Sequence, residues 1–151
     1  PTLETRVMDV CTRLDDTVAL TALLVCILRM LYRLRTHNQR WRIYTPMLIR
    51  ENRWRAMRYS FDEGMIDLAK GVVVPFETLI EEIFALVAED AEALGCEKEL
   101  AGVRAILSRG TSAHRQRREF ELERAAGNSV EDSLKAVVDT LIEDTAEGLK
   151  V

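Results

Sequence analysis

Residues 75–95 read PFETLIEEIFALVAEDAEALG, and this stretch indicates the class of the fold. From Phe76 to Ala91 its apolar side chains recur at intervals of three or four positions, which places them on one face of an α-helix. Pro75 is a residue that commonly begins a helix, and Gly95 is one that commonly ends it. The stretch therefore predicts an amphipathic helix that reaches residue 93 or 94.

The whole chain predicts a mainly α fold, a helical bundle with one N-terminal strand and a small β-hairpin. Alternating side chains over residues 2–10 predict the strand, and residues 65–67 and 72–74 predict the hairpin, with a turn at Lys70 and Gly71. The other predicted helices run from Asp15 or Asp16 to about Arg35, from Asn38 through Trp41, from Pro46 to about Tyr59, from residue 96 or 97 to Ser108, from residue 111 or 112 through Ala126, and onward from Ser129. The first of these is apolar nearly all round, so we expect it at the centre.

The length of 151 residues suits one domain or a fragment of a larger one. We divide it into a strand and turn (1–14), an arginine-rich helical segment (15–60), the hairpin (61–74) and the C-terminal helices (75–151). A lone strand is unusual because its backbone needs a neighbour. We therefore expect the N-terminal strand to belong to a sheet whose other strands are missing from this chain.

Composition excludes several classes of protein. With 48% hydrophobic residues, 30% charged residues and only 7 Gly and 3 Pro, the chain is neither collagen-like nor disordered. Its 3 cysteines lack paired spacing, and with 2 histidines there is no zinc-site motif, so we expect neither a disulfide scaffold nor a structural zinc. The longest apolar run, residues 17–28, is shorter than a membrane span. These features predict a cytoplasmic protein that does not enter a membrane.

Charge is distributed unevenly along the chain. Residues 29–58 contain nine arginines and one acid, a net charge of +8, so the remainder carries −12 of the total of −4. The planar guanidinium group suits bidentate binding of carboxylate or phosphate. This segment predicts a local anionic partner.

Glu4 and Arg6 are candidates for chemistry on the predicted strand. Residues two apart on a strand face the same way, about 7 Å apart. A carboxylate and a guanidinium on one surface could hold a divalent cation and a phosphate, and the alternative is an ordinary surface ion pair. Asp15 and Asp16 could likewise bind Mg²⁺, although such residues more often cap a helix.

A second candidate site lies in residues 46–59. Asn52 and Arg55 share one face of this predicted helix, and Arg58 lies on the neighbouring face with Trp54. Such a face could bind a nucleotide phosphate or a substrate carboxylate, and the alternative is a solvated basic face with Trp54 in the core. Aromatic residues between arginines also suit RNA, although the acidic total charge argues against it.

Three stretches of the sequence resemble the C-terminal part of the bacterial carboxylate–amine ligases of the glutamate–cysteine ligase type 2 branch. They are residues 1–16 (PTLETRVMDVCTRLDD), 38–41 (NQRW) and 51–59 (ENRWRAMRY), and the resemblance covers the whole chain. It implies a glutamine-synthetase-like catalytic sheet with the Glu4–Arg6 strand on its active-site face. It also implies that ATP, assisted by Mg²⁺, phosphorylates the γ-carboxylate of glutamate, and that an amine, typically that of cysteine, attacks the acyl phosphate.

The resemblance implies roles for individual residues. Glu4 would be a Mg²⁺ ligand, and Arg6 would neutralise the transferring phosphate or hold the glutamyl group. Asn52, Arg55 and Arg58 would lie at or near the substrate site. The partners would be glutamate, an amine such as cysteine and the upstream part of the same protein, and a homo-oligomer is possible. We expect this chain alone to be inactive, because most of the ATP and metal site would lie upstream.

The alternative hypothesis is a non-enzymatic helical binding module. Its arginine-rich segment, residues 29–58, would bind RNA or an acidic partner.

Overall fold

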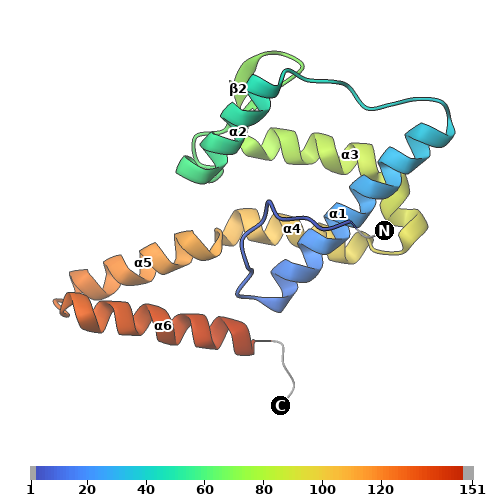
Figure 1. Ribbon diagram of the computed structural model, residues 1–151. Coiled ribbons are helices and arrows are strands. Elements are labelled where there is room, and N and C mark those ends of the chain that lie inside the picture. The colour runs from blue at the N-terminus through green and yellow to red at the C-terminus, as the bar shows by residue number, and fades with distance from the viewer. Residues whose placement is uncertain (1–2, 148–151) are drawn as a thin grey trace. The chain divides into compact units, whose positions relative to one another are not determined.

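The computed structural model describes residues 3–147, which form helices and one small hairpin (Figure 1). The elements are α1 (Leu14–Thr36), α2 (Pro46–Tyr59), β1 (Met65–Asp67), β2 (Val72–Val74), α3 (Phe76–Leu94), α4 (Glu97–Arg109), α5 (Ser112–Ala125) and α6 (Val130–Ala146). The predicted mainly α fold with a small hairpin is therefore confirmed.

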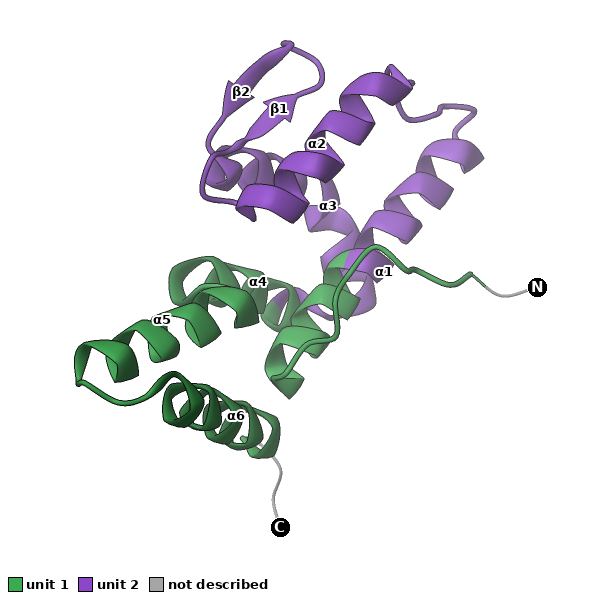
Figure 2. Ribbon diagram, turned by 60° about the vertical axis from the view of Figure 1, so that its left-hand side comes forward, with its two compact units in different colours: residues 1–23, 98–151 green, residues 24–97 purple. Residues whose placement is uncertain are grey.

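The chain divides into two compact units (Figure 2). One unit comprises residues 1–23 and 98–151, and the other comprises residues 24–97. Helix α1 contributes its first part to one unit and its second part to the other. Each unit is described by itself below.

The predicted N-terminal strand is not formed over residues 3–10, and Thr2 lies outside the described residues. Residues 3–13 have neither helical nor strand structure. A strand needs a neighbouring backbone to receive its hydrogen bonds, and the only paired strands in the described part of the chain are β1 and β2, which pair with each other. Alternation of side chains alone therefore does not make a strand here.

The predicted short helix from Asn38 is also wrong, because Asn38 ends α1 and begins nothing. Its φ of 58° is in the left-handed region. The N–H of Asn38 donates to the carbonyl of Arg35 over 3.1 Å, and that of Gln39 donates to the carbonyl of Leu34 over 2.8 Å. This pair of bonds closes a helix C-terminus, a position where asparagine is tolerated in place of glycine.

In unit 24–97 the hairpin, α3 and the second part of α1 surround an apolar core. The register pairs Met65 with Val74, Ile66 with Val73 and Asp67 with Val72. The turn is fixed by Asp67, whose Oδ1 accepts hydrogen bonds from the backbone N–H groups of Ala69 (2.9 Å) and Lys70 (3.2 Å). The buried apolar side chains come from α1, β1 and α3: Cys26, Met30, Met65, Ile80, Phe84, Val87 and Ala91.

Unit 1–23 with 98–151 pairs α5 with α6 and packs α4 on the start of α1. Gly102 of α4 permits a close approach, since a Cβ atom there would lie 3.0 Å from the Cβ of Ala19. On α6, the fully buried hydroxyl of Ser133 donates to the carbonyl of Ser129 over 2.7 Å. Ser129 also caps α6 as predicted, since its hydroxyl accepts from the N–H of Asp132.

Helix α1 is not buried all round. Its buried residues form one stripe, Asp16, Ala19, Ala22, Cys26 and Met30, while Val18, Val25, Leu28 and Tyr32 are exposed. By length and composition alone α1 could cross a membrane, and it is the only described helix of which this is true. Since its buried stripe packs inside both units, we interpret it as a packing helix with one apolar face left uncovered.

Candidate functional site

Glu4 and Arg6 point to the same side and bind each other. Arg6 Nε lies 2.8 Å from Glu4 Oε1, and Arg6 Nη2 donates to Glu4 Oε2 over 2.8 Å. Both side chains are open to solvent, with 80% of Arg6 and 67% of Glu4 exposed. A guanidinium has five N–H donors, so three remain for another anion. The two side chains therefore lie together as an exposed ion pair, which is the alternative stated above for these residues, and the strand that suggested the site is not formed.

A partly buried ionic cluster joins the end of this N-terminal segment to the C-terminal helices of the same unit. Arg115 on α5 donates to Thr12 Oγ1 over 3.1 Å and to Asp144 Oδ2 on α6 over 2.6 Å. Arg13 donates to Asp144 Oδ1 over 3.2 Å and also binds Glu147. Burial alone would raise the pKa of Asp144, but its bonds to Arg115 and Arg13 outweigh this and lower it. The cluster thus stays charged and fixes the chain eight residues after Glu4.

Asp16 is part of the same scaffold. Its carboxylate is buried and binds the guanidinium of Arg109 on α4. Among the described residues no group of three or more His, Cys, Asp or Glu side chains could hold a metal ion. The structure thus gives Asp16 a structural role at the start of α1.

Asn52 on α2 closes the outer edge of the hairpin. Its Nδ2 donates to the carbonyl of Ile66 over 2.8 Å, and its Oδ1 accepts from the Ile66 N–H over 2.7 Å. The amide therefore satisfies both backbone groups that β1 turns away from β2, as a neighbouring strand would. These two hydrogen bonds fix α2 against β1.

Arg55, one turn further along α2, binds the backbone that leads into β1. Its Nε donates to the carbonyl of Gly64 over 3.1 Å, and its Nη2 donates to that of Glu63 over 2.6 Å. Gly64 is required here, because its φ is +67° and a Cβ would lie 2.3 Å from the carbonyl oxygen of Val74. Asn52 and Arg55 together position the hairpin.

Arg58 differs from Asn52 and Arg55 because it is exposed. Its guanidinium carbon lies 5.6 Å from the ring centroid of Tyr59, and it has no carboxylate partner among residues 3–147. Trp54 contacts the same ring edge-on, with the centroids 5.5 Å apart, and is 48% exposed. The interpretation that placed Trp54 in the core is therefore wrong. Arg58 is the member of the predicted trio with a free charged head.

A groove of about 630 Å³ runs beside α2 and the hairpin within unit 24–97. Trp41, Arg42 and Tyr44 from the connection between α1 and α2 line one part of it, and Asn52 lies among its walls. The rest of the lining comes from β1, the hairpin turn and α3, and it includes the carboxylates of Asp67 and Glu82 beside apolar residues such as Ile66, Leu68, Leu79, Ile83 and Leu86. The groove combines aromatic side chains with one guanidinium and two carboxylates, so it could take a planar small molecule, and its charge does not favour an anion.

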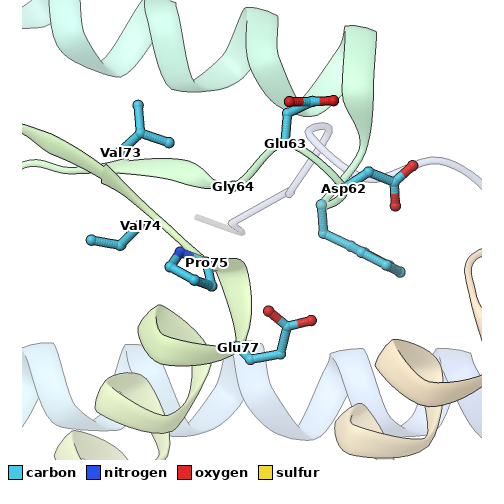
Figure 3. A pocket seen from close by; sticks show the side chains of 8 residues that line it. Asp62, Glu63, Gly64, Val73, Val74, Pro75 and Glu77 are labelled. Atoms are coloured by element: carbon cyan, nitrogen blue, oxygen red, sulfur yellow. The ribbon is translucent and has the colours of Figure 1, made fainter.

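A second hollow, of about 540 Å³, lies where the hairpin meets α3 (Figure 3). Three carboxylates, those of Asp62, Glu63 and Glu77, surround the backbone of Gly64 and Val74. Its acidic character makes it unsuitable for the phosphate groups predicted from the sequence.

Residues 1–139 match the model of the family described as Glutamate-cysteine ligase family 2 (GCS2). The chain belongs to this family. A protein of Rhodospirillum rubrum named "Putative glutamate--cysteine ligase 2" is 56% identical over 149 residues, which is 99% of this chain and 38% of that protein. Proteins with the same name from Jannaschia sp. (50% identical over 144 residues, 95% of this chain and 38% of that protein) and Chloroflexus aggregans (37% over 150 residues, 99% and 36%) also match.

The chain therefore spans well under half the length of these glutamate–cysteine ligase 2 relatives. It corresponds to a C-terminal part of such a ligase, as the resemblance implied. No solved structure matches it. The roles of these residues at a reacting centre remain predictions: Glu4, Arg6, Asn52, Arg55 and Arg58.

The sequence analysis did not predict two sets of ion pairs that are centred on aspartates. Asp90, fully buried on α3, binds Arg29 and Arg33 of α1, and Asp144 binds Arg13 and Arg115. The only available signal was an aspartate in line with apolar residues on a helix face, since Asp90 adjoins Val87 and Ala91. Part of the positive charge of residues 29–58 is thus used inside the fold.

Proposed function

We propose that this chain is part of an ATP-dependent ligase that joins the γ-carboxylate of glutamate to an amine such as that of cysteine through an acyl phosphate. In this reaction a carboxylate attacks a phosphate, so two anions must approach each other. Cationic groups near both are needed to offset their charge. The substrates would be glutamate, an amine and ATP.

The observation that carries the proposal is the exposed Glu4–Arg6 pair, in which a carboxylate and a guanidinium lie side by side. Arg6 keeps three N–H donors for the transferring phosphate or the glutamyl carboxylate. The cluster of Thr12, Arg13, Arg115 and Asp144 holds the C-terminal end of this segment, eight residues after Glu4.

Mg²⁺ fits the donor chemistry of Glu4, since it prefers carboxylate oxygens. When bound, it would neutralise the charge of the triphosphate. One carboxylate is too few ligands for an ion that takes six, and the other ligands would come from ATP, water and residues beyond this chain. Glu4 would hold the metal while Arg6 holds the anion beside it.

Uncovered apolar faces support the view that the working protein is larger. On α6, Val130, Leu134, Val138 and Ile142 repeat every fourth position and are each more than half exposed. Val18 and Val25 leave a comparable stripe on α1. Contiguous apolar surface of this kind normally lies against other polypeptide. The remainder of the ligase would cover these faces.

The proposal is tested with a full-length ligase that contains this chain. Phosphate release from ATP should require both glutamate and the amine, and Arg6→Lys and Glu4→Gln should each lower kcat at least 100-fold without unfolding the protein. Unchanged turnover in both variants would contradict the proposal. The chain of residues 1–151 by itself should show no turnover, and robust ligation by it would contradict the view that it holds only part of the site.

A second candidate function rests on the exposed surface of α2. This helix buries none of its residues and exposes Arg50, Arg53, Arg58 and Trp54, a combination that suits RNA or an acidic protein surface. Binding of the chain to an oligonucleotide that weakens steeply with salt would favour this function. Absence of binding at low salt would remove it.

A further inference from the structure

Two cysteines far apart in the sequence meet inside unit 24–97. The Sγ atoms of Cys26 and Cys96 lie 3.5 Å apart although 70 positions separate the residues. Both are free thiols. Cys26 is fully buried on α1, whereas Cys96 is partly exposed in the junction between α3 and α4. Cys96 can therefore be reached from solvent, whereas Cys26 is closed off from it.

The backbone holds Cys96 in this place. Gly95 takes a left-handed φ of 64° and its N–H donates to the carbonyl of Glu92 over 3.0 Å. The N–H of Cys96 donates to the carbonyl of Ala91 over 3.1 Å. These two bonds are the usual closure of a helix C-terminus. They direct Cys96 back toward the helix pair formed by α1 and α3.

The two thiols differ in reactivity because their surroundings differ. Burial, with the hydrogen bond to Cys96, raises the pKa of the Cys26 thiol to about 12, so it stays protonated near neutral pH. A thiolate is the form that attacks a disulfide. Cys96 is thus the thiol that meets a reagent first.

We propose that Cys26 and Cys96 form a thiol–disulfide exchange site that reacts with a low-molecular-weight disulfide of the cystine class. The Cys96 thiolate attacks one sulfur of the reagent, a Cys96–reagent bond forms, and the reagent's own S–S bond breaks to release one thiolate. Cys26 then loses its proton and attacks Cys96 Sγ, and the second half of the reagent leaves as a thiolate. The two protein thiols are oxidised, the reagent is reduced to two thiols, and the two protein protons pass to them.

The product would join α1 to the α3–α4 junction across a loop of 70 positions. A covalent link across a long loop restricts the unfolded chain and so stabilises the folded one. The effect is reversible, because a reducing thiol regenerates both groups. The inference is independent of the proposed ligase activity, since it is read from masses and thiol counts.

The sequence allows a direct test. Trypsin places the three cysteines in different peptides, residues 7–13, 14–29 and 71–98. The folded chain is incubated with cystine, the remaining thiols are blocked with an alkylating reagent, and the unreduced digest is analysed by mass spectrometry. We expect one linked peptide pair, formed by residues 14–29 and 71–98, and no disulfide from either peptide to the Cys11 peptide, whether Cys11 is alkylated or holds half of the reagent. Addition of dithiothreitol should restore three thiols and lower the thermal midpoint that oxidation had raised.

Matched variants separate the two steps. In Cys26→Ala the reaction with cystine should stop at a mixed disulfide on Cys96. In Cys96→Ala the Cys26 thiol should stay unmodified. The control variant Cys11→Ala should form the same cross-link as the parent chain. A parent chain that keeps the reagent on Cys96 without cross-linking would overturn the proposal, as would a link that includes Cys11. The result with the parent chain decides the question even where a variant fails to fold.

Discussion

The guanidinium of Arg33 on α1 donates two hydrogen bonds to the carboxylate of Asp90 on α3, from Nε to Oδ1 over 3.2 Å and from Nη2 to Oδ2 over 2.8 Å. Arg29 adds a third, from Nη1 to Oδ1 over 2.5 Å. Asp90 is completely buried, whereas 25% of the Arg33 side chain and 35% of the Arg29 side chain remain exposed. The carboxylate is thus the centre of the α1–α3 contact in unit 24–97.

Asp90→Asn should destabilise the protein strongly. The variant keeps the shape of the side chain but removes the charge that balances two arginines, and breaking a buried ion pair typically costs about 3 kcal/mol or more. Urea unfolding measures the loss. The exposed Glu51→Gln on α2 is the matched control and should change the free energy of unfolding by less than about 0.5 kcal/mol. Equal effects of the two substitutions would contradict the role given to Asp90.

The same carboxylate should make stability depend on pH at the acidic end. The hydrogen bond from Arg33 holds the pKa of Asp90 below its usual range, against the opposing effect of burial. A group whose pKa is lower in the folded protein stabilises it fully above the unfolded pKa of about 3.9 and ceases to do so as the pH falls through the folded pKa. The urea midpoint should therefore decline below about pH 4. Asp90→Asn should show a shallower decline, and identical slopes would contradict this assignment.

Gly64 and Gly71 form a matched pair in the hairpin. Both have positive φ, +67° and +72°, but a Cβ at Gly64 would lie 2.3 Å from the carbonyl oxygen of Val74, while a Cβ at Gly71 meets nothing within 4 Å. Gly71→Ala should cost about 1 kcal/mol, the strain of the left-handed region alone. Gly64→Ala should cost about 1–3 kcal/mol more, because the strand must move. Thermal unfolding of the two variants measures the difference in their loss of stability. Equal midpoints would show that the close approach to Val74 does not affect stability.

Sequence reasoning predicted well those elements that are specified by neighbouring residues. Thr45 and Pro46 mark the start of α2, and Gly95 marks the end of α3, because each sets the local backbone directly. Asn38 misled the prediction, since asparagine serves at both ends of helices and its local sequence does not say which.

The rest depends on contacts between distant parts of the chain. Nothing near Asp90 states that its partner is Arg33, which lies 57 positions earlier. The strand expected over residues 2–10 depends on a neighbouring strand, and none pairs with it among residues 3–147. Asn52 and Arg55 were correctly placed on one helix face, yet their partners are backbone groups of the hairpin, which carry no side-chain signature.

Asn52 should be more important for folding than for chemistry. Asn52→Ala removes both partners of the Ile66 backbone, and leaving such groups unpaired costs about 2 kcal/mol. Hydrogen exchange should show the Ile66 amide losing most of its protection. Asn52→Asp keeps the acceptor and loses the donor, so it should preserve protection at the Ile66 N–H better than alanine does. Unchanged exchange in the alanine variant would contradict the edge-closing role.

Substitutions of Arg55 and Arg58 should distinguish a residue that stabilises the fold from one that binds substrate. Arg55 donates to the carbonyls of Gly64 and Glu63, so Arg55→Ala should lower the thermal midpoint of the protein. Arg58 is exposed, and its guanidinium lies near the Tyr59 ring. Arg58→Ala should therefore change the free energy of unfolding by no more than about 0.5 kcal/mol, as a surface substitution does, and leave the thermal midpoint almost unchanged. In a full-length ligase, however, Arg58→Ala should raise KM for an anionic substrate about 10-fold or more, since a charged hydrogen bond contributes about 1.5–3 kcal/mol. An Arg58 variant with unchanged KM for both glutamate and ATP would remove this residue from the substrate site and leave its charge to the surface of α2.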